Sequence, residues 1–276
     1  MTVEKKLQWC RKVSKNWKRP HWRILYYHGV EKDQVASFRT QLLWMKQFFA
    51  CCSISEGVAA LNANAVDQAY LSITFDDADL SVYEHALPVL IELGVSACIY
   101  VVPSYVKTGH SFRDPIPRNT MTWSQIRECH FAGMEIGSHT LTHVESARCS
   151  DERFIQEITL SKEIIEQNLG ERVLHFAYPW GQHNSRTQMH LINSGDYESV
   201  ATIKRGSMVN DSSPHYLLRD QVNVALSPES VEIKMRLADH LYLIKKLKRE
   251  RFESYTDRHP EETWGELSPE ELRQYY

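Results

Sequence analysis

Short apolar runs alternate along the chain with longer stretches in which apolar positions recur at helical spacing. The runs LSITF and VSACIYVV are almost continuously hydrophobic, which is typical of parallel strands buried on both faces. The strand-like runs cover Arg23–His28, Leu71–Phe75, Val95–Val102, Met134–Ser138, Val173–Tyr178, Tyr197–Ile203 and Leu217–Val224. The helical stretches cover Ser37–Phe49, Val82–Leu93, Trp123–Phe131, Asp151–Leu169 and Arg186–Ser194, and Ser150 is a candidate N-cap of the fourth. This alternation predicts an α/β fold of parallel strands with crossover helices, and the buried strands favour a barrel.

No internal repeat, low-complexity tract or Gly/Ser-rich linker divides the chain, so we expect one barrel domain over residues 23–226. A basic segment, residues 1–22, would precede the barrel, and a helical extension, residues 227–276, would follow it. The 276 residues suffice for this arrangement, because α/β barrels commonly use about 250 residues as one unit.

Composition narrows the possible partners and location. The formal net charge is −3, which gives no global basic field of the kind that binds nucleic acid. The six cysteines form no CxxC pair, so we interpret them as free thiols in a reducing compartment. No apolar run approaches the roughly 20 residues that span a bilayer, and the N-terminus lacks the apolar stretch of a secretory signal. The sequence therefore predicts a cytoplasmic protein and gives no oligomeric state.

Ionisable side chains stand where the strand-like runs end. Asp76 and Asp77 follow LSITF, and His139 follows the run that ends at Ser138, with His143 four residues later. The C-terminal ends of parallel barrel strands share one rim, so residues distant in sequence converge there. On a helical turn, the spacing of the histidines would put both imidazoles on one face. Two alternatives remain open: the Asp pair is a turn or helix cap, or the His pair is a surface pair without a ligand.

Two histidines and one aspartate form a three-ligand set that leaves a coordination position open, as in catalytic rather than structural metal sites. An open position can hold a water molecule, whose pKa zinc lowers to about 7. A second carboxylate beside it could accept the proton of that water. The pattern thus contains the parts of an amide hydrolase. Zn²⁺ is the expected ion, and Co²⁺, Mn²⁺ and Ni²⁺ are alternatives because such donor sets accept several first-row metals.

TFDD (Thr74–Asp77), SHTLTH (Ser138–His143) and FAYPWG (Phe176–Gly181), in this order, resemble the motifs of the polysaccharide deacetylase family with the NodB homology domain, also called carbohydrate esterase family 4. The FAYPxG form resembles the exopolysaccharide-processing branch. The resemblance extends over about residues 23–224 and includes YYHGV (Tyr26–Val30). It implies a distorted (β/α)7 barrel and metal-dependent removal of N-acetyl groups from amino sugars.

The resemblance also implies roles for individual residues. Asp76 would be the general base, and Asp77, His139 and His143 would be the metal ligands. The turn Tyr178–Gly181 would contact the substrate and its oxyanion: Trp180 stands where the family usually has Tyr, whose backbone N–H stabilises the oxyanion, and Pro179 would help to shape the turn.

Three departures from the family pattern stand out. Ala177 occupies the position of an arginine that orients the base in many members, and Ala78 replaces the glycine that usually follows TFDD. The late Leu-x-His motif that supplies the general acid has no clear counterpart, because Leu217–Arg219 resembles an LPR variant instead. We consider His183 and His215 as candidate acids, with ordinary surface histidines as the alternative. His28 and Arg219 are candidate pocket residues that contact the substrate or the oxyanion.

The N-terminal region suggests contact with an anionic membrane surface. Basic residues and tryptophans alternate there, as in interfacial segments: Lys5, Lys6, Trp9, Arg11, Lys12, Lys15, Trp17, Lys18, Arg19, Trp22 and Arg23. A second basic stretch, Lys245–Arg251, follows near the C-terminus. The hypothesis is peripheral association with the inner face of the membrane, and a solvated helix face is the alternative.

The leading hypothesis is a metal-dependent hydrolase that removes N-acetyl groups from a GlcNAc-type sugar of a surface glycan or its lipid-linked precursor. Deformylation, or hydrolysis of another amide within the same superfamily, is one alternative. A non-catalytic carbohydrate-binding relic is another, motivated by Ala177 and by the lack of an identified acid.

Overall fold

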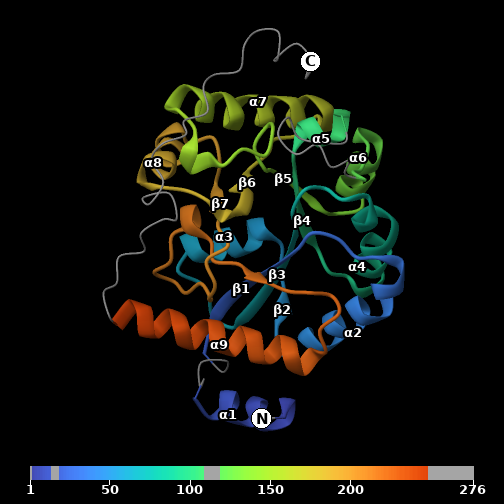
Figure 1. Ribbon diagram of the computed structural model, residues 1–276, viewed down its shortest axis with the longest axis vertical. Helices are drawn as coiled ribbons and strands as arrows, with labels where there is room; N and C mark the ends of the chain where they lie inside the picture. The colour runs from blue at the N-terminus through green and yellow to red at the C-terminus, as the bar shows by residue number, and fades with distance from the viewer. Residues whose placement is uncertain (1, 14–18, 109–118, 248–276) are drawn as a thin grey trace.

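The computed structural model describes residues 2–13, 19–108 and 119–247, and helices surround a central curled sheet (Figure 1). The strands are β1 (His21–Tyr27), β2 (Ala50–Cys51), β3 (Ala69–Phe75), β4 (Ala97–Val101), β5 (Glu135–Ser138), β6 (His175–Ala177), β7 (Ser199–Ala201) and β8 (Asp220–Gln221). The helices are α1 (Val3–Val13), α2 (Val35–Met45), α3 (Ile54–Asn62), α4 (Leu87–Leu93), α5 (Pro103–Thr108), α6 (Trp123–Phe131), α7 (Asp151–Leu169), α8 (Ser185–Ser194) and α9 (Pro228–Leu247).

The strands form one parallel sheet in the order β7-β6-β5-β4-β3-β1-β8, with β2 paired to β3. The two ends of this order meet, because Leu217, just before β8, forms a parallel bridge with Ala201 of β7. The predicted fold class, a distorted (β/α)7 barrel, is confirmed. Neighbouring parallel strands must be joined by crossover segments, and the helices between the strands form these crossovers.

The predicted elements match the observed ones best where local signals are strong. Helix α7 has the predicted bounds, and the Ser150 side chain accepts a hydrogen bond from the Arg153 N–H, as an N-cap does. Strands β6, β7 and β8 are shorter than the apolar runs that predicted them. Four elements, α1, β2, α3 and α5, are not among the predicted ones.

The basic N-terminal segment is partly built into the fold. Helix α1 packs on α9, where Leu7 and Cys10 are buried against Ile233. Trp22 is fully buried in the core, and Arg23 is fully buried as well. Neither residue is available to a membrane surface, which corrects their place in the predicted interfacial segment. The side chains of the second basic stretch, Lys245–Arg251, lie outside the described residues. Within the described part of the chain, no helix is both long and apolar enough to cross a bilayer.

Arg23 of β1 is the centre of a buried ion cluster. Its guanidinium donates to Asp220 of β8 and to Asp239 of α9. All three side chains are nearly inaccessible to solvent, so each charge depends on the others for its compensation. The cluster ties the first strand, the last strand and the final helix together.

We expect Arg23→Met to lower the free energy of unfolding by about 3–5 kcal/mol, because it leaves the buried Asp239 carboxylate without a cation and the buried Asp220 carboxylate with Arg205 alone. Urea denaturation followed by circular dichroism measures this change. Arg39→Met is the matched control, since Arg39 pairs with Glu92 at an exposed surface and its removal should leave stability nearly unchanged. Equal effects of the two substitutions would contradict a structural role for the buried cluster.

Candidate active site

Asp77, His139 and His143 meet at the rim formed by the carboxyl ends of β3 and β5. One ligand atom from each of them lies within 4.8 Å of the other two, and all three side chains are buried. The Asp77 Oδ1 atom is 3.3 Å from His143 Nε2 and 3.8 Å from His139 Nε2. Two imidazole nitrogens and one carboxylate oxygen in this arrangement suit a divalent transition metal and leave coordination positions for other ligands.

The histidines do not lie on a helical turn, contrary to the expectation from their spacing. They follow β5 in an irregular loop, in which Thr140 (φ 64°) and His143 (φ 56°) adopt the left-handed conformation. The loop folds back instead of continuing as a helix, and the two imidazole centroids are 5.0 Å apart. The conformation of the loop, and not helical periodicity, therefore brings the two imidazoles together.

A backbone contact and burial prepare His139 for metal binding. Its Nδ1 atom is 2.7 Å from the carbonyl oxygen of Ala177, which can only accept, so Nδ1 carries the proton and Nε2 is left as a ligand. Burial lowers the pKa of His139 to about 4. The imidazole is therefore neutral near pH 7, which is the form that binds a metal.

Asp76 is held by a second buried contact, with Arg219. The guanidinium donates from Nη1 to Oδ1 (2.6 Å) and from Nη2 to Oδ2 (3.0 Å). Burial would raise the pKa of Asp76, but the charge and hydrogen bonds of Arg219 outweigh it, and the pKa is lowered. Asp76 is thus a carboxylate, and its ionised form is fixed in orientation next to the cluster of Asp77, His139 and His143.

Trp180 follows β6 in a left-handed conformation (φ 50°), and its side chain is about half exposed at 49%. Its ring meets the His143 ring edge to face, with centroids 4.2 Å apart. The neighbouring N–H groups of Tyr178, Gly181 and Gln182 donate to backbone carbonyls. Among the described residues, no group accepts a hydrogen bond from the backbone N–H of Trp180, so this donor can serve a ligand.

A cavity of about 220 Å³ opens onto these groups. It is lined by Tyr26, His28, Asp76, Asp77, His139, His143, Trp180, Ile203 and Gln221. The two candidate acids from the sequence do not line it. His183 is buried in a stack on Tyr178 and contacts the Gly181 carbonyl, and His215 contacts the Tyr197 carbonyl. Tyr178 and Pro179 are buried and are not among the residues that line the cavity either.

The chain is similar to known polysaccharide deacetylases in sequence and in fold. A sequence profile described as polysaccharide deacetylase matches residues 63–198, about half of the chain. YxkH of Bacillus subtilis, provisionally named a polysaccharide deacetylase, is 27% identical over 56% of this chain and 52% of its own length. A poly-β-1,6-N-acetyl-D-glucosamine N-deacetylase of Staphylococcus aureus is 20% identical over 71% of each chain. The solved structure of the Streptococcus pyogenes deacetylase PplD in complex with acetate has a TM-score of 0.68 at 22% identity, over 79% of this chain and 99% of that one.

Residues 63–198 form a domain of the polysaccharide deacetylase family. The predicted resemblance is confirmed, since the matching family and the named relatives are polysaccharide deacetylases. The chain spans about half the length of YxkH.

One departure from the family pattern is resolved by Arg219. The family motif would place an arginine at position 177 to orient the base, and this chain has a buried alanine there. Arg219 reaches Asp76 from the other side, from the segment just before β8. The sequence analysis expected Arg219 to contact substrate or oxyanion, but the structure buries it completely behind Asp76. The absence of an arginine at position 177 therefore no longer argues for a non-catalytic relic.

Arg219 is held on all sides. Its Nε donates to the Thr202 carbonyl, and its guanidinium lies over the Tyr26 and Tyr100 rings, 4.8 and 5.2 Å from their centroids. The sequence did carry a signal for this role, which is the charged pair Arg219–Asp220 inside a strand-like run. Charged residues in a buried strand need counterions, and that requirement could have suggested buried ion pairs here.

The turn after β3 accommodates a second departure. Asp77 (φ 70°) and Ala78 (φ 52°) are both left-handed, a conformation that glycine adopts more readily than alanine. Ala78 is fully buried in the main core, where its methyl group contributes to packing. The packing around Ala78 thus stabilises a strained backbone conformation directly after Asp76.

We expect Asp76→Asn to destabilise the metal-free protein by about 3–5 kcal/mol at pH 7, because it leaves the buried Arg219 cation without a counterion. An unfolded Asp has a pKa of about 3.9, so the wild-type pair contributes fully above that pH. Its contribution is lost as the pH falls through the lower pKa of the folded state. Urea denaturation at pH 7 and at decreasing acid pH should therefore show the two proteins converging.

Asp67→Asn is the control for this experiment, since Asp67 is an exposed carboxylate. It should leave the free energy of unfolding close to that of the wild type throughout. A difference between wild type and Asp76→Asn that did not change with pH would show that Asp76 is not ionised in the folded protein.

Proposed function

We propose that the protein is a metal-dependent hydrolase that removes N-acetyl groups from a GlcNAc-type sugar of a surface glycan or its lipid-linked precursor. The observation that carries this proposal is the pairing of two sites at one rim: a buried Asp-His-His cluster and, beside it, a carboxylate kept ionised by Arg219. Family membership supports the deacetylase chemistry, and the name of the Staphylococcus aureus relative supports a GlcNAc polymer as the substrate class.

Asp77, His139 and His143 would hold the cation, with Zn²⁺ the first choice and Co²⁺, Mn²⁺ and Ni²⁺ as alternatives. When bound, the cation would activate a water molecule and polarise the acetamide carbonyl. The neutral imidazole of His139 and its backbone contact at Nδ1 favour this ligand role.

Asp76 would act as the general base. It is not part of the ligand cluster, and its ionised state leaves it able to accept the proton of the attacking water as the new C–O bond forms. Arg219 would orient the carboxylate during this transfer. The Trp180 N–H would donate to the carbonyl oxygen as it becomes an oxyanion.

His28 is the best candidate for the general acid. It is exposed and lines the same cavity as the metal cluster, whereas His183 and His215 do not. A protonated imidazole there could give its proton to the sugar nitrogen as the C–N bond breaks, so that acetate and a glycan amine leave. The cytoplasmic location and the contact with an anionic membrane remain predictions.

We expect Asp76→Asn to retain the metal and to lose turnover by about 10²–10⁴-fold, because it removes the base and leaves all three ligand side chains in place. His139→Ala should lose both metal and turnover, since it removes a ligand. The two readouts are metal content by elemental analysis and acetate release from N-acetylated GlcNAc oligosaccharides. His85→Ala, on the helical segment before α4 and outside the cavity, is the control that should preserve both.

Normal turnover of Asp76→Asn would show that another group is the base. Release of formate from an N-formyl sugar, without release of acetate from its N-acetyl counterpart, would favour the deformylase alternative. A protein that binds no divalent ion and gains no activity from Zn²⁺, Co²⁺ or Mn²⁺ would favour the carbohydrate-binding relic.

We expect His28→Gln to lower kcat by about 10²-fold or more and to retain the metal, since the leaving nitrogen would lose its proton donor. Acetate release and metal content of both proteins measure the effect. A kcat of His28→Gln close to the wild-type value would assign the acid to another residue.

A further inference from the structure

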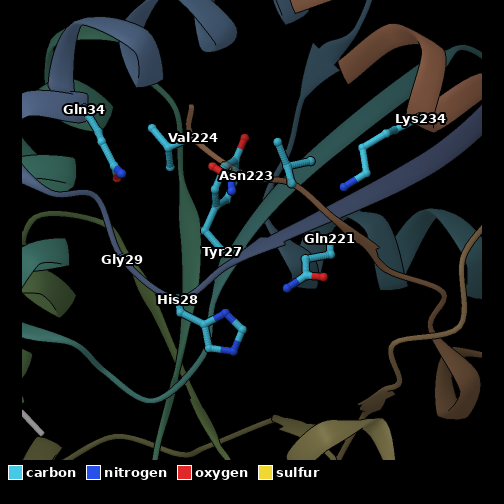
Figure 2. Close-up of a pocket in the computed structure, with 9 residues that line it drawn as sticks. Tyr27, His28, Gly29, Gln34, Gln221, Asn223, Val224 and Lys234 are labelled. Carbon is cyan, nitrogen blue, oxygen red and sulfur yellow. The ribbon is translucent and has the colours of Figure 1, made fainter. Parts of the chain in front are cut away.

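A second pocket adjoins the cavity of the metal cluster. Its volume is about 310 Å³, larger than the 220 Å³ of the first cavity, and His28 and Gln221 line both. Figure 2 shows the Gln34 amide and the Lys234 ammonium extending inward from either side of the segment that carries Asn223. A substrate group that enters the metal cavity would therefore have its neighbouring group next to this second pocket.

The hydrogen-bonding groups of this pocket are mostly donors. The side-chain oxygen of Gln34 accepts from the Glu31 N–H, and that of Asn223 accepts from the Ala225 N–H. Because these backbone groups can only donate, both side-chain NH₂ groups are left for a ligand. Two backbone acceptors of the wall are already used, since the Gln41 amide donates to the carbonyls of Asn223 and Val224.

Lys234 of α9 adds a positive charge to these donors. Among the described residues, no hydrogen bond or ion pair holds its ammonium group, and no carboxylate is among the residues that line the pocket. The nearby Asp220 is occupied by Arg23 and Arg205. Lys234 is partly buried. This burial and the charge of Arg205 lower the pKa of Lys234, and Asp220 opposes them.

We propose that this second pocket binds an anionic oxygen group, a carboxylate or a phosphate, on the unit next to the sugar that is deacetylated. A cation and two amide donors with their acceptors occupied match such a group better than they match a neutral sugar hydroxyl, which also needs an acceptor. The preferred substrate would then be an acidic glycan or a sugar phosphate. The inference rests on the proposed function, because deacetylation at the metal cluster is what places the neighbouring unit of the substrate next to this second pocket.

Equilibrium binding tests the pocket without hydrolysis. The protein is the full chain with Asp76→Asn, in which turnover is slow enough for equilibrium binding to be measured. Three ligands are compared by isothermal titration calorimetry: N,N′-diacetylchitobiose as the neutral ligand, a GlcNAc–glucuronic acid disaccharide as the carboxylate, and GlcNAc 1-phosphate as the phosphate. At least one anionic ligand should bind at least about 10-fold more tightly than the neutral one, because a charge-assisted hydrogen bond contributes this much to the affinity.

Lys234→Met, added to this protein, should abolish that preference and leave the affinity for the neutral ligand unchanged, and Lys234→Arg should restore it. Lys32→Met removes a positive charge from a nearby exposed position outside the pocket, and it should preserve the preference. Equal affinity for all three ligands, or equal effects of Lys234→Met and Lys32→Met, would overturn the proposal. The anion that binds better identifies the source, carboxylate or phosphate.

Acetate release by the wild-type protein separates the two proposals. If the Lys234-dependent preference is present and acetate is not released from any of these ligands, the anion pocket stands and the proposed deacetylation fails. If acetate is released at the same kcat/KM from neutral and anionic substrates, and Lys234→Met changes neither, the deacetylation stands and the anion pocket is wrong.

Discussion

The buried contact between Asp76 and Arg219 is the constraint on which the site depends. A carboxylate in this interior needs a cation, and the guanidinium supplies one with two parallel hydrogen bonds. The contact also joins distant parts of the barrel, because Asp76 follows β3 and Arg219 precedes β8, on opposite sides of β1. The same contact therefore orients the proposed base and links the strands at which the sheet closes.

The site also concentrates unfavourable backbone conformations. Asp77, Ala78, Thr140, His143 and Trp180 all have positive φ values and lie in loops that follow β3, β5 and β6. Each such residue costs free energy, and the surrounding packed barrel is what keeps it in place. The rigid strands thus support loops whose geometry the ligand cluster requires, as barrel folds do at their C-terminal rim.

The sequence predicted the fold class and the family, and its motifs named the residues that converge on one cavity. Local signals were enough for α7, where Ser150 marks the helix start, and for the carboxyl ends of the strands at Asp77 and His139. Three features could not be read from local patterns. Short strands such as β8 carry too few residues for a periodic signal. The fold of the loop between His139 and His143 depends on left-handed residues that are not glycine. The partner of Asp76 lies 143 positions away, and tertiary structure alone brings it close.

The pairing of β1 with both β3 and β8 has a consequence for the order in which the protein is made. Synthesis delivers β1 and β3 early, while Arg219, Asp220 and Asp239 leave the ribosome only after nearly the whole barrel has been translated. Until then Arg23 and Asp76 lack their counterions, and both charges must remain hydrated. Burial of these two charges with their counterions, and with it the closure of the sheet at β1, therefore has to wait for the last strand.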